Sequence, residues 1–170
     1  MTLPLRTERL VIREFEADDL DKLAALYGDP AVLWWEPEPY SRERSAEAPA
    51  HVLELYRTEG IAEFAVCLAS TGEVIGDCGP VYRDVEGERL PELGWDLRSD
   101  HWGHGYATEA ARGVLTHAAS VGLRRVYSLI TPGNVRSQGV ARRLGMSIER
   151  EVVYAERPHD LWALDLPAPG

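Results

Sequence analysis

The chain of 170 residues contains only two cysteines, Cys67 and Cys78, which are too few for a disulfide framework. Their spacing matches no metal-binding motif, and the five histidines form no HExxH or comparable cluster. We therefore expect two reduced thiols and no metal centre.

Long apolar runs are missing as well. No stretch approaches the roughly 18 to 20 uninterrupted apolar residues of a membrane-spanning helix. The first residues, MTLPLRTERLVIREF, become charged too early for a secretion signal. These absences predict a cytoplasmic protein that does not act at a membrane.

Basic residues are scarce, with 18 Lys and Arg against 28 Asp and Glu and a net charge of −10. Because a nucleic-acid-binding domain needs a basic face, we expect no nucleic-acid partner. The charge is also uneven, since residues 1–100 have a balance of −12 and residues 101–170 a balance of +2. The positive part begins at a glycine-rich stretch, which favours an anion site there.

The apolar content of 45% is enough for one hydrophobic core, and the length suits a single domain over residues 1–170. Gly94 interrupts an apolar strand pattern and predicts a bulge or a close approach of a ligand. Periodicity and turn residues predict strands over 9–15, 62–69, 73–82, 90–97, 124–132, 147–154 and 159–166, and helices over 18–27, 41–59, 105–121 and 134–144. This order predicts an α+β fold with a central mixed, mostly antiparallel, seven-stranded sheet.

The stretch HWGHGYATEAA, from His101 to Ala111, places two glycines directly before a helix-forming run. The first amides of a helix lack intrahelical partners, and the positive end of the helix dipole lies there. A glycine-rich entry can therefore surround a phosphate with N–H donors. An ordinary strand-to-helix turn would explain the glycines alone, so the surrounding sequence has to decide.

In this element order, ELGWDLRSDHWGHGYATEAARGVLTHA and NVRSQGVARRLGM resemble the two signature segments of the GNAT superfamily of acyl-CoA N-acetyltransferases. The resemblance runs from about Thr7 to Leu166. The segment LRTERLVIREFEADDLDKLAALYGDPAV and the GYATEA form of the motif resemble the RimJ/RimL-type protein N-terminal acetyltransferases. The resemblance implies a GNAT-like fold with helices on both faces of the sheet, with its fourth and fifth strands, 90–97 and 124–132, splayed apart around the cofactor.

The cofactor implied by this resemblance is acetyl-CoA. Amides of the glycine-rich turn would hold the pyrophosphate, and the strand around Trp95 would bind pantetheine. Arg142 and Arg143 would lie near the adenosine 3′-phosphate, although a solvated helix face is an equally good interpretation of that pair. The full implied set is Trp95, Asp96, Leu97, Trp102, Gly103, His104, Gly105, Tyr106, Ala107, Thr108, Asn134, Ser137, Arg142 and Arg143.

Two positions depart from the family pattern. Trp102 stands where many members carry Gln or Arg, and Ala141 stands where many carry a tyrosine that protonates the leaving thiolate. Ser137, Tyr154 and water remain candidates for that proton, and a thiolate is already a fair leaving group near neutral pH.

The implied reaction is direct attack of a neutral amine on the thioester. At pH 7 roughly a tenth of an α-amine is free base but under a thousandth of a lysine side chain is, so a terminal amine needs only a weak base. Glu92, just before Gly94, is the first choice for this catalytic base, and Ser137 is the second catalytic candidate. His101 has a suitable pKa but fits an exposed turn better.

The acceptor would lie beside the aromatic and acidic segment LWWEPEPYSRE, in which Trp34, Trp35, Glu36 and Tyr40 are the candidate substrate-binding residues. This composition suits a cationic peptide or small molecule, although at least one of the two tryptophans is more simply a core residue. A protein or peptide N-terminal amine is the expected acceptor, and a polyamine or antibiotic is the alternative among enzymes. Monomer and homodimer both remain open.

Two other classes of protein need to be weighed. A non-catalytic acyl-CoA-binding module would keep the cofactor contacts without turnover. A dinucleotide-binding oxidoreductase is disfavoured, because the third glycine of GxGxxG is absent and hairpins precede the motif.

Overall fold

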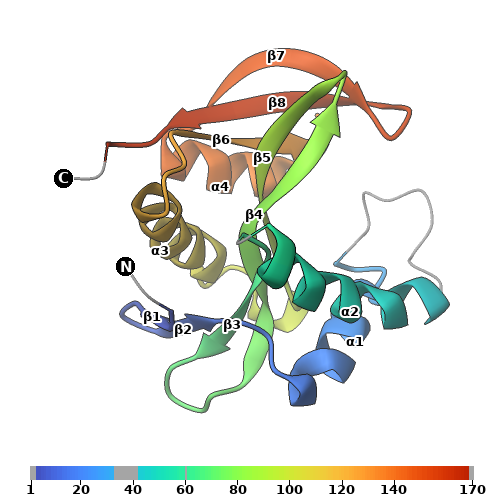
Figure 1. Ribbon diagram of the computed structural model, residues 1–170, viewed down its shortest axis with the longest axis vertical. Coiled ribbons are helices and arrows are strands. Elements are labelled where there is room, and N and C mark those ends of the chain that lie inside the picture. Colours follow the sequence, from blue (N-terminus) through green and yellow to red (C-terminus); the bar gives the residue numbers. More distant parts are fainter. Residues whose placement is uncertain (1–2, 33–41, 60, 169–170) are drawn as a thin grey trace.

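Pairing of the apolar strands forms one sheet, which is drawn in Figure 1 from the computed structural model. The structure describes residues 3–32, 42–59 and 61–168, and within them the strand order is β1-β2-β3-β4-β5-β6-β8-β7. The strands are β1 (Leu5–Arg6), β2 (Leu10–Arg13), β3 (Phe64–Leu68), β4 (Val74–Val85), β5 (Glu88–Leu97), β6 (Arg125–Ile130), β7 (Ser147–Tyr154) and β8 (Arg157–Asp165). Every pairing is antiparallel except β5 with β6, which is parallel.

The mixed α+β sheet agrees with the expectation from sequence, but these strands number eight and not seven. The additional one is β1, whose two residues pair with Val11 and Ile12 on β2. A segment of two residues is too short to show the alternation that identifies a strand, so periodicity could not reveal it.

Helices cover both faces of the sheet, with α3 (Tyr106–Ser120) and α4 (Val135–Leu144) on one and α1 (Leu20–Tyr27) and α2 (Arg42–Thr58) on the other (Figure 1). Helix α2 continues through Pro49, so this proline does not end the helix. Within the described residues, no helix has both the length and the apolarity to cross a bilayer.

Each layer of helices buries its own apolar cluster. Small residues of α3, including Ala110, Ala111 and Val114, pack with no exposed area against Phe64, Leu93 and other strand residues. On the opposite face, α1 and α2 contribute Leu23, Leu26 and Val52 to a second cluster. The small side chains on α3 bring that helix close to β4 and β5, which fixes the position of its first turn.

Strands β5 and β6 are splayed, as expected, because only Glu92 and Tyr127 pair across them. Just beyond that pair the buried hydroxyl of Ser128 donates to the Leu93 carbonyl at 2.7 Å. Backbone groups alternate between the two sides of a strand, so Trp95, two residues further along, also directs its N–H and C=O towards β6. The splay therefore leaves polar backbone groups of β5 facing a gap.

The bulge predicted at Gly94 is wrong. The register between β4 and β5 is continuous from Gly76 opposite Leu97 to Val85 opposite Glu88, and Gly94 pairs with Gly79. The glycine instead leaves space, since a Cβ built on Gly94 would have only one neighbour within 4 Å, Glu92 Oε2 at 3.9 Å. The other half of the prediction, room for a ligand, agrees with this geometry.

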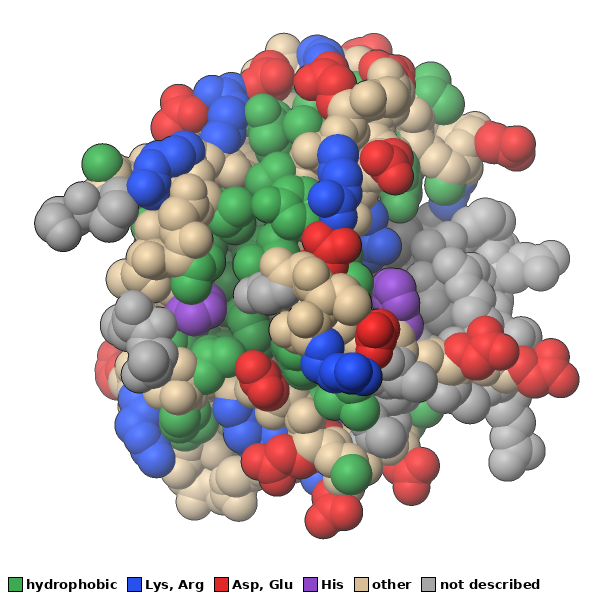
Figure 2. Space-filling view, viewed as in Figure 1, with side chains coloured by type: hydrophobic (Ala, Val, Ile, Leu, Met, Phe, Trp, Pro, Cys, Tyr) green, Lys and Arg blue, Asp and Glu red, His purple; other side chains and the backbone are tan. Residues whose placement is uncertain are grey.

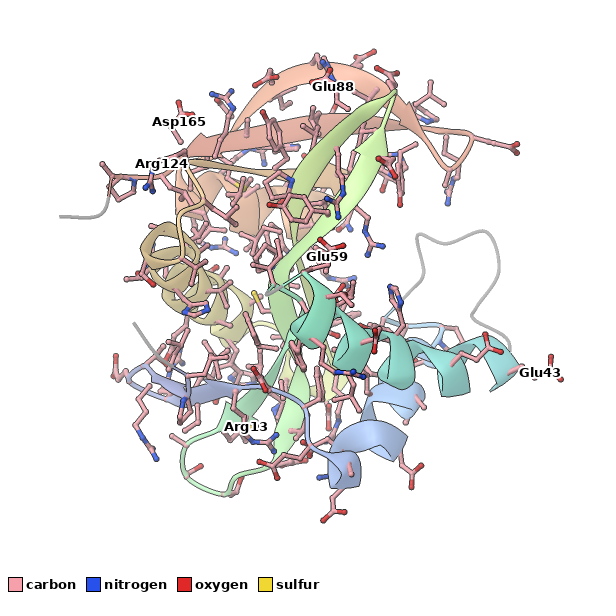
Figure 3. The ribbon with its side chains drawn as sticks, in the orientation of Figure 1. Arg13, Glu43, Glu59, Glu88, Arg124 and Asp165 are labelled. Carbon is pink, nitrogen blue, oxygen red and sulfur yellow. The ribbon has the colours of Figure 1, made fainter. Side chains whose placement is uncertain are left out.

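Two charged contacts connect elements that lie apart in the fold. Arg13 on β2 donates to the buried Asp19 at 2.6 Å and so connects the sheet to the start of α1. Arg150 on β7 binds Glu88, at the tip of the β4–β5 hairpin, at 2.9 Å. Arg13 and Glu88 are both labelled in Figure 3.

Candidate active site

The glycine-rich turn enters α3 in a conformation that favours glycine. Gly103 has a φ of 81° and Gly105, the N-cap of the helix, has a φ of 80°. This left-handed region costs a side-chain-bearing residue roughly 1 to 2 kcal/mol. The turn directs the first amides of α3, which have no intrahelical partner, towards one end of the helix. The local geometry is that of an anion-binding helix start.

A contact from the amino-terminal part of the chain holds this turn. Glu109, in the first turn of α3, accepts hydrogen bonds from the Thr7 hydroxyl at 2.5 Å and the Arg9 backbone N–H at 2.8 Å. The Arg9 guanidinium then donates to Glu109 at 2.7 Å and to the His104 carbonyl at 3.0 Å, and lies over the Tyr106 ring. The carbonyl of His104 is thereby held on the side of the turn that faces Arg9.

A cavity of about 480 Å³, which we call the cofactor cavity, opens at this turn and runs between β5 and α4. Most of the residues that line it were expected from sequence to contact acetyl-CoA. Its lining is Val32, Trp95, Asp96, Leu97, Trp102, Gly103, Gly105, Tyr106, Ala107, Thr108, Asn134, Val135, Arg136, Ser137, Gly139, Val140 and Arg143.

Side chains of α4 build the far wall of the cofactor cavity. The Asn134 side chain caps α4 by accepting the Ser137 N–H at 3.1 Å, which leaves its amide nitrogen as the part that can donate to a ligand. Arg143 donates to the Thr108 hydroxyl at 3.2 Å and connects α4 to α3. Arg136 lies over the Trp102 ring, 4.6 Å from its centroid.

Several sequence-predicted residues lie elsewhere. His104 and Arg142 are absent from the lining of the cofactor cavity, and Arg142 instead contacts Gln138 and the Trp162 ring. Tyr154 lines neither cavity described here, but its ring packs on His159, which lines the smaller of the two. Ala141 is fully buried against Met146 and Trp162, so that position of α4 belongs to the core. Trp34, Trp35, Glu36 and Tyr40 fall outside the described residues.

A second, smaller cavity of about 120 Å³ adjoins the first, and we call it the acceptor cavity. The two cavities share Trp95, Asp96, Asn134 and Ser137. The lining of the acceptor cavity is Glu63, Asp77, Arg83, Glu92, Leu93, Gly94, Trp95, Asp96, Ser128, Leu129, Ile130, Thr131, Asn134, Ser137 and His159. The shared wall means that groups bound in the two cavities meet beside Trp95. His101 lines neither cavity.

Glu92 lies in the acceptor cavity with its side chain only 16% exposed. Burial raises the pKa of Glu92 above its ordinary value, the cation of Arg83 opposes this rise from 3.8 Å, and the nearby charge of Glu63 adds to it. Burial likewise raises the pKa of Glu63, whose carboxylate lies 3.6 Å from Arg83. A carboxylate with a raised pKa is a better proton acceptor than an exposed one.

Sequence reasoning missed Arg9, Glu109 and Asp77. The first two meet although 100 residues separate them, and Asp77 lies on a strand that pattern analysis treated as structural. The one available signal for Asp77 is a carboxylate within an otherwise apolar strand, VIGDCGPVY, where a charged residue needs an explanation.

Comparison with known proteins identifies the family of this chain. The family model for an acetyltransferase (GNAT) domain matches residues 9–147. An uncharacterized N-acetyltransferase p20 of Bacillus licheniformis is 34% identical over 136 residues, 78% of this chain and 76% of that protein. An acetyltransferase structure from Agrobacterium tumefaciens has a TM-score of 0.79 and 26% identity, covering 96% of this chain and 95% of its own.

A more distant structure shares the fold. RimL, a ribosomal L7/L12 alpha-N-protein acetyltransferase solved with coenzyme A, has a TM-score of 0.78 at 19% identity and covers 96% of this chain and 97% of its own. Together with the family match over most of the chain, the glycine turn before α3 and the splayed strands, these likenesses establish that this chain belongs to the GNAT family and is an acetyl-CoA-dependent N-acetyltransferase.

Proposed function

We propose that the protein acetylates the primary amine of a cationic acceptor, with the N-terminal amine of a protein or peptide as the first candidate. The observation that supports this most directly is the wall shared by the two cavities. Glu92 faces the acceptor cavity on one side of Trp95, and the turn before α3 opens into the cofactor cavity on the other. An amine beside Glu92 would therefore lie next to a thioester held along β5.

The residues of the cofactor cavity fit acetyl-CoA in their chemistry. The amides between Gly103 and Thr108 suit the pyrophosphate, and Arg136 and Arg143 bring positive charge to the same cavity. The unpaired backbone of Trp95 suits the amides of pantetheine, since both carry donors and acceptors at strand spacing. Bound there, acetyl-CoA supplies the thioester whose acetyl group is transferred.

The role of the chain's own groups follows from their positions. Glu92, directly or through a water, takes the proton that the acceptor ammonium must lose before its nitrogen can attack. The neutral amine then forms the new C–N bond, the C–S bond breaks with its electron pair on sulfur, and the nitrogen releases its second proton, which neutralises the thiolate. The Trp95 N–H, directed into the gap, is placed to stabilise negative charge on the carbonyl oxygen. The Ser137 hydroxyl, in the wall of both cavities, is placed to return a proton to sulfur.

A small-molecule amine is the second candidate acceptor. The enclosed volume of about 120 Å³ accommodates a small amine or the first residue of a peptide, but not a folded segment. Thiol release from acetyl-CoA with N-terminal peptides, polyamines and aminoglycosides at equal concentration tests the proposal. Turnover of a cationic amine with a KM that rises with salt is the expected result, because charge attraction is screened over about 8 to 10 Å. Binding of acetyl-CoA without thiol release for any amine would instead mark a non-catalytic binding module.

A further inference from the structure

Carboxylates gather in the acceptor cavity in a way that the transfer reaction alone does not require. Four of them line it, Glu63 ahead of β3, Asp77 on β4, and Glu92 and Asp96 on β5. On the face shown in Figure 2 acidic and basic side chains are interspersed, so this concentration of one sign is local. Arg83 is the one basic side chain of Lys or Arg type in the described lining, and its ion pairs there are with Glu63 and Glu92.

Asp77 is the unsatisfied member of this group. The residue is 1% exposed, and its Oδ2 atom has no hydrogen-bond partner among the described residues. Its carboxyl group accepts from the Tyr27 hydroxyl and the Asp96 backbone N–H through its other oxygen. Within the described part of the chain no basic side chain forms an ion pair with it. A buried acceptor without a donor costs several kcal/mol, so a ligand that brings a donor to this atom would gain binding energy.

The surroundings of Asp77 are negatively charged and favour a cation. Burial, and then the negative charges of Asp96 and Glu63, raise its pKa well above the ordinary value. Asp77 is therefore protonated more readily than an exposed aspartate. An ammonium ion would replace that proton and would bring three N–H donors with its positive charge.

Between Glu92 and Asp96 the surface of the acceptor cavity carries no side chain from β5, and we call this part of the surface the floor. Gly94 lies between these two residues on the same face of β5, and its partner across the ladder is Gly79. A Cβ on Gly79 would lie 2.1 Å from the Ala62 carbonyl oxygen, so that position must stay glycine. The two acids are four residues apart, about 13 Å between Cα atoms at ordinary strand rise. This span suits a short alkyl chain with an ammonium group at each end, once the carboxylate side chains reach inward.

We propose that Asp77, with Asp96 beside it, forms a subsite for a second ammonium group of the acceptor, so that preferred acceptors carry two positive charges joined by a short alkyl chain. The proposal rests on the proposed function, because the first amine is the one beside Glu92. The same chemistry is offered by a free aliphatic diamine and by a peptide that begins with lysine, whose α-amine and side chain supply the two charges.

The test compares matched acceptors with the intact protein and saturating acetyl-CoA. The pairs are 1,5-diaminopentane against pentylamine, and lysine amide against norleucine amide, which differ by one ammonium group. We expect kcat/KM to favour the dication in at least one pair by about tenfold or more. The pair with the larger preference shows whether the two ammonium groups of the preferred acceptor belong to a free diamine or to an amino-terminal lysine. Equal rates within both pairs would overturn the proposal.

The variant Asp77→Asn should reduce that preference to near unity, because it removes the charge that binds the second ammonium group. The matched control is Asp84→Asn, an exposed carboxylate on the same strand, which should keep the wild-type preference. Gly94→Ala places a methyl group between Glu92 and Asp96 and should also reduce the preference for dications. It is the substitute variant if Asp77→Asn does not fold. An unchanged preference for dications in a folded Asp77→Asn protein would overturn the proposed subsite. If Asp77→Asn does not fold, an unchanged preference in Gly94→Ala would overturn it.

A binding measurement separates this inference from the proposed function. If no amine is acetylated, calorimetric binding of 1,5-diaminopentane that Asp77→Asn abolishes would support the subsite while the proposed function fails. If amines are acetylated but neither pair shows a preference, the function stands and the subsite is wrong.

Discussion

Glu109 and Arg9 are joined by three contacts, although one begins a helix and the other precedes a strand near the start of the chain. The carboxylate accepts the backbone N–H and the Nε–H of Arg9, and a terminal guanidinium nitrogen lies 2.6 Å from Oε2. Burial opposes the charge of Glu109, but hydrogen bonds from Thr7 and Arg9 lower its pKa overall. The carboxylate is therefore charged where it orients the arginine that holds the His104 carbonyl.

Glu109→Gln should weaken acetyl-CoA binding by roughly threefold to tenfold, because loss of the charged contact releases Arg9 and loosens the turn. Calorimetric titration measures this change. Arg9→Lys should not restore affinity, since an ammonium group cannot make the forked contact. The control Glu88→Gln breaks a more exposed ion pair at the hairpin tip, away from both cavities, and should leave affinity unchanged. Equal losses in Glu109→Gln and Glu88→Gln would rule out a positioning role.

Gly105→Ala should weaken acetyl-CoA binding at least tenfold, because a side chain disfavours the φ of 80° with which this residue presents the first amides of α3 to the cofactor cavity. The φ of 80° also costs stability, so a control of equal strain is needed. Gly122→Ala supplies it, since Gly122 has a φ of 106° and open space around it at the far end of α3. Both variants should melt a few degrees lower, but only the first should lose affinity.

Glu92→Gln should lower kcat by roughly 10² to 10⁴ and leave acetyl-CoA affinity intact if Glu92 is the base. The loss should shrink as pH rises, because more acceptor is then neutral without help. In the wild type kcat/KM should fall as pH drops through the pKa of Glu92, since the base must be ionised. Arg83→Gln removes the cation that lowers the pKa of Glu92, so the fall of kcat/KM with decreasing pH should begin at a higher pH.

His101→Ala is the control for Glu92→Gln and should be nearly silent, because His101 lines neither cavity. If the histidine variant loses activity and Glu92→Gln does not, the assignment of the base is wrong.

Asp19 provides a prediction on stability. Burial alone would raise its pKa, but hydrogen bonds from Arg13, Glu16 and Lys22 lower it to about 2. A lowered pKa stabilises the folded state above the unfolded pKa near 3.9, and this stabilisation is lost as pH falls towards 2. Asp19→Asn should therefore cost about 2 kcal/mol at pH 7 and little near pH 2. Chemical denaturation at both pH values measures the free energy of unfolding. The control variant Asp21→Asn, at an exposed position, should change it by no more than about 0.5 kcal/mol.

Local patterns in the sequence predicted most of the fold. Alternating apolar residues identified β2, β5 and β8, and Gly28 and Gly145 identified where α1 and α4 end. The resemblance carried by WGHGYATEA led to a turn whose residues do line a cavity. These features succeed because a helix start, a glycine turn and an amphipathic face are all encoded within a few neighbouring residues.

Features that depend on the meeting of distant segments could not be predicted in this way. Gly94 indicated a bulge, but its regular pairing with Gly79 depends on a second strand. Arg142 and Arg143 are equivalent in sequence, yet only Arg143 faces the cofactor cavity, because the Trp162 ring holds the other. The meeting of Asp77 with Glu63, Glu92 and Asp96 in one cavity likewise depends on segments far apart in the sequence, and a single sequence does not report such an arrangement.

The single backbone pairing between β5 and β6 also bears on how the two halves of the sheet are held together. Strands β6, β8 and β7 are joined to the rest of the sheet there by that pairing and the Ser128 hydroxyl, with α3 packed behind. A ligand bonded to Trp95 would lie across this seam and tie the two half-sheets together. Since a ligand at 100 times its Kd adds about 2.7 kcal/mol to folding stability, the chain would resist proteases best where its acyl donor is plentiful.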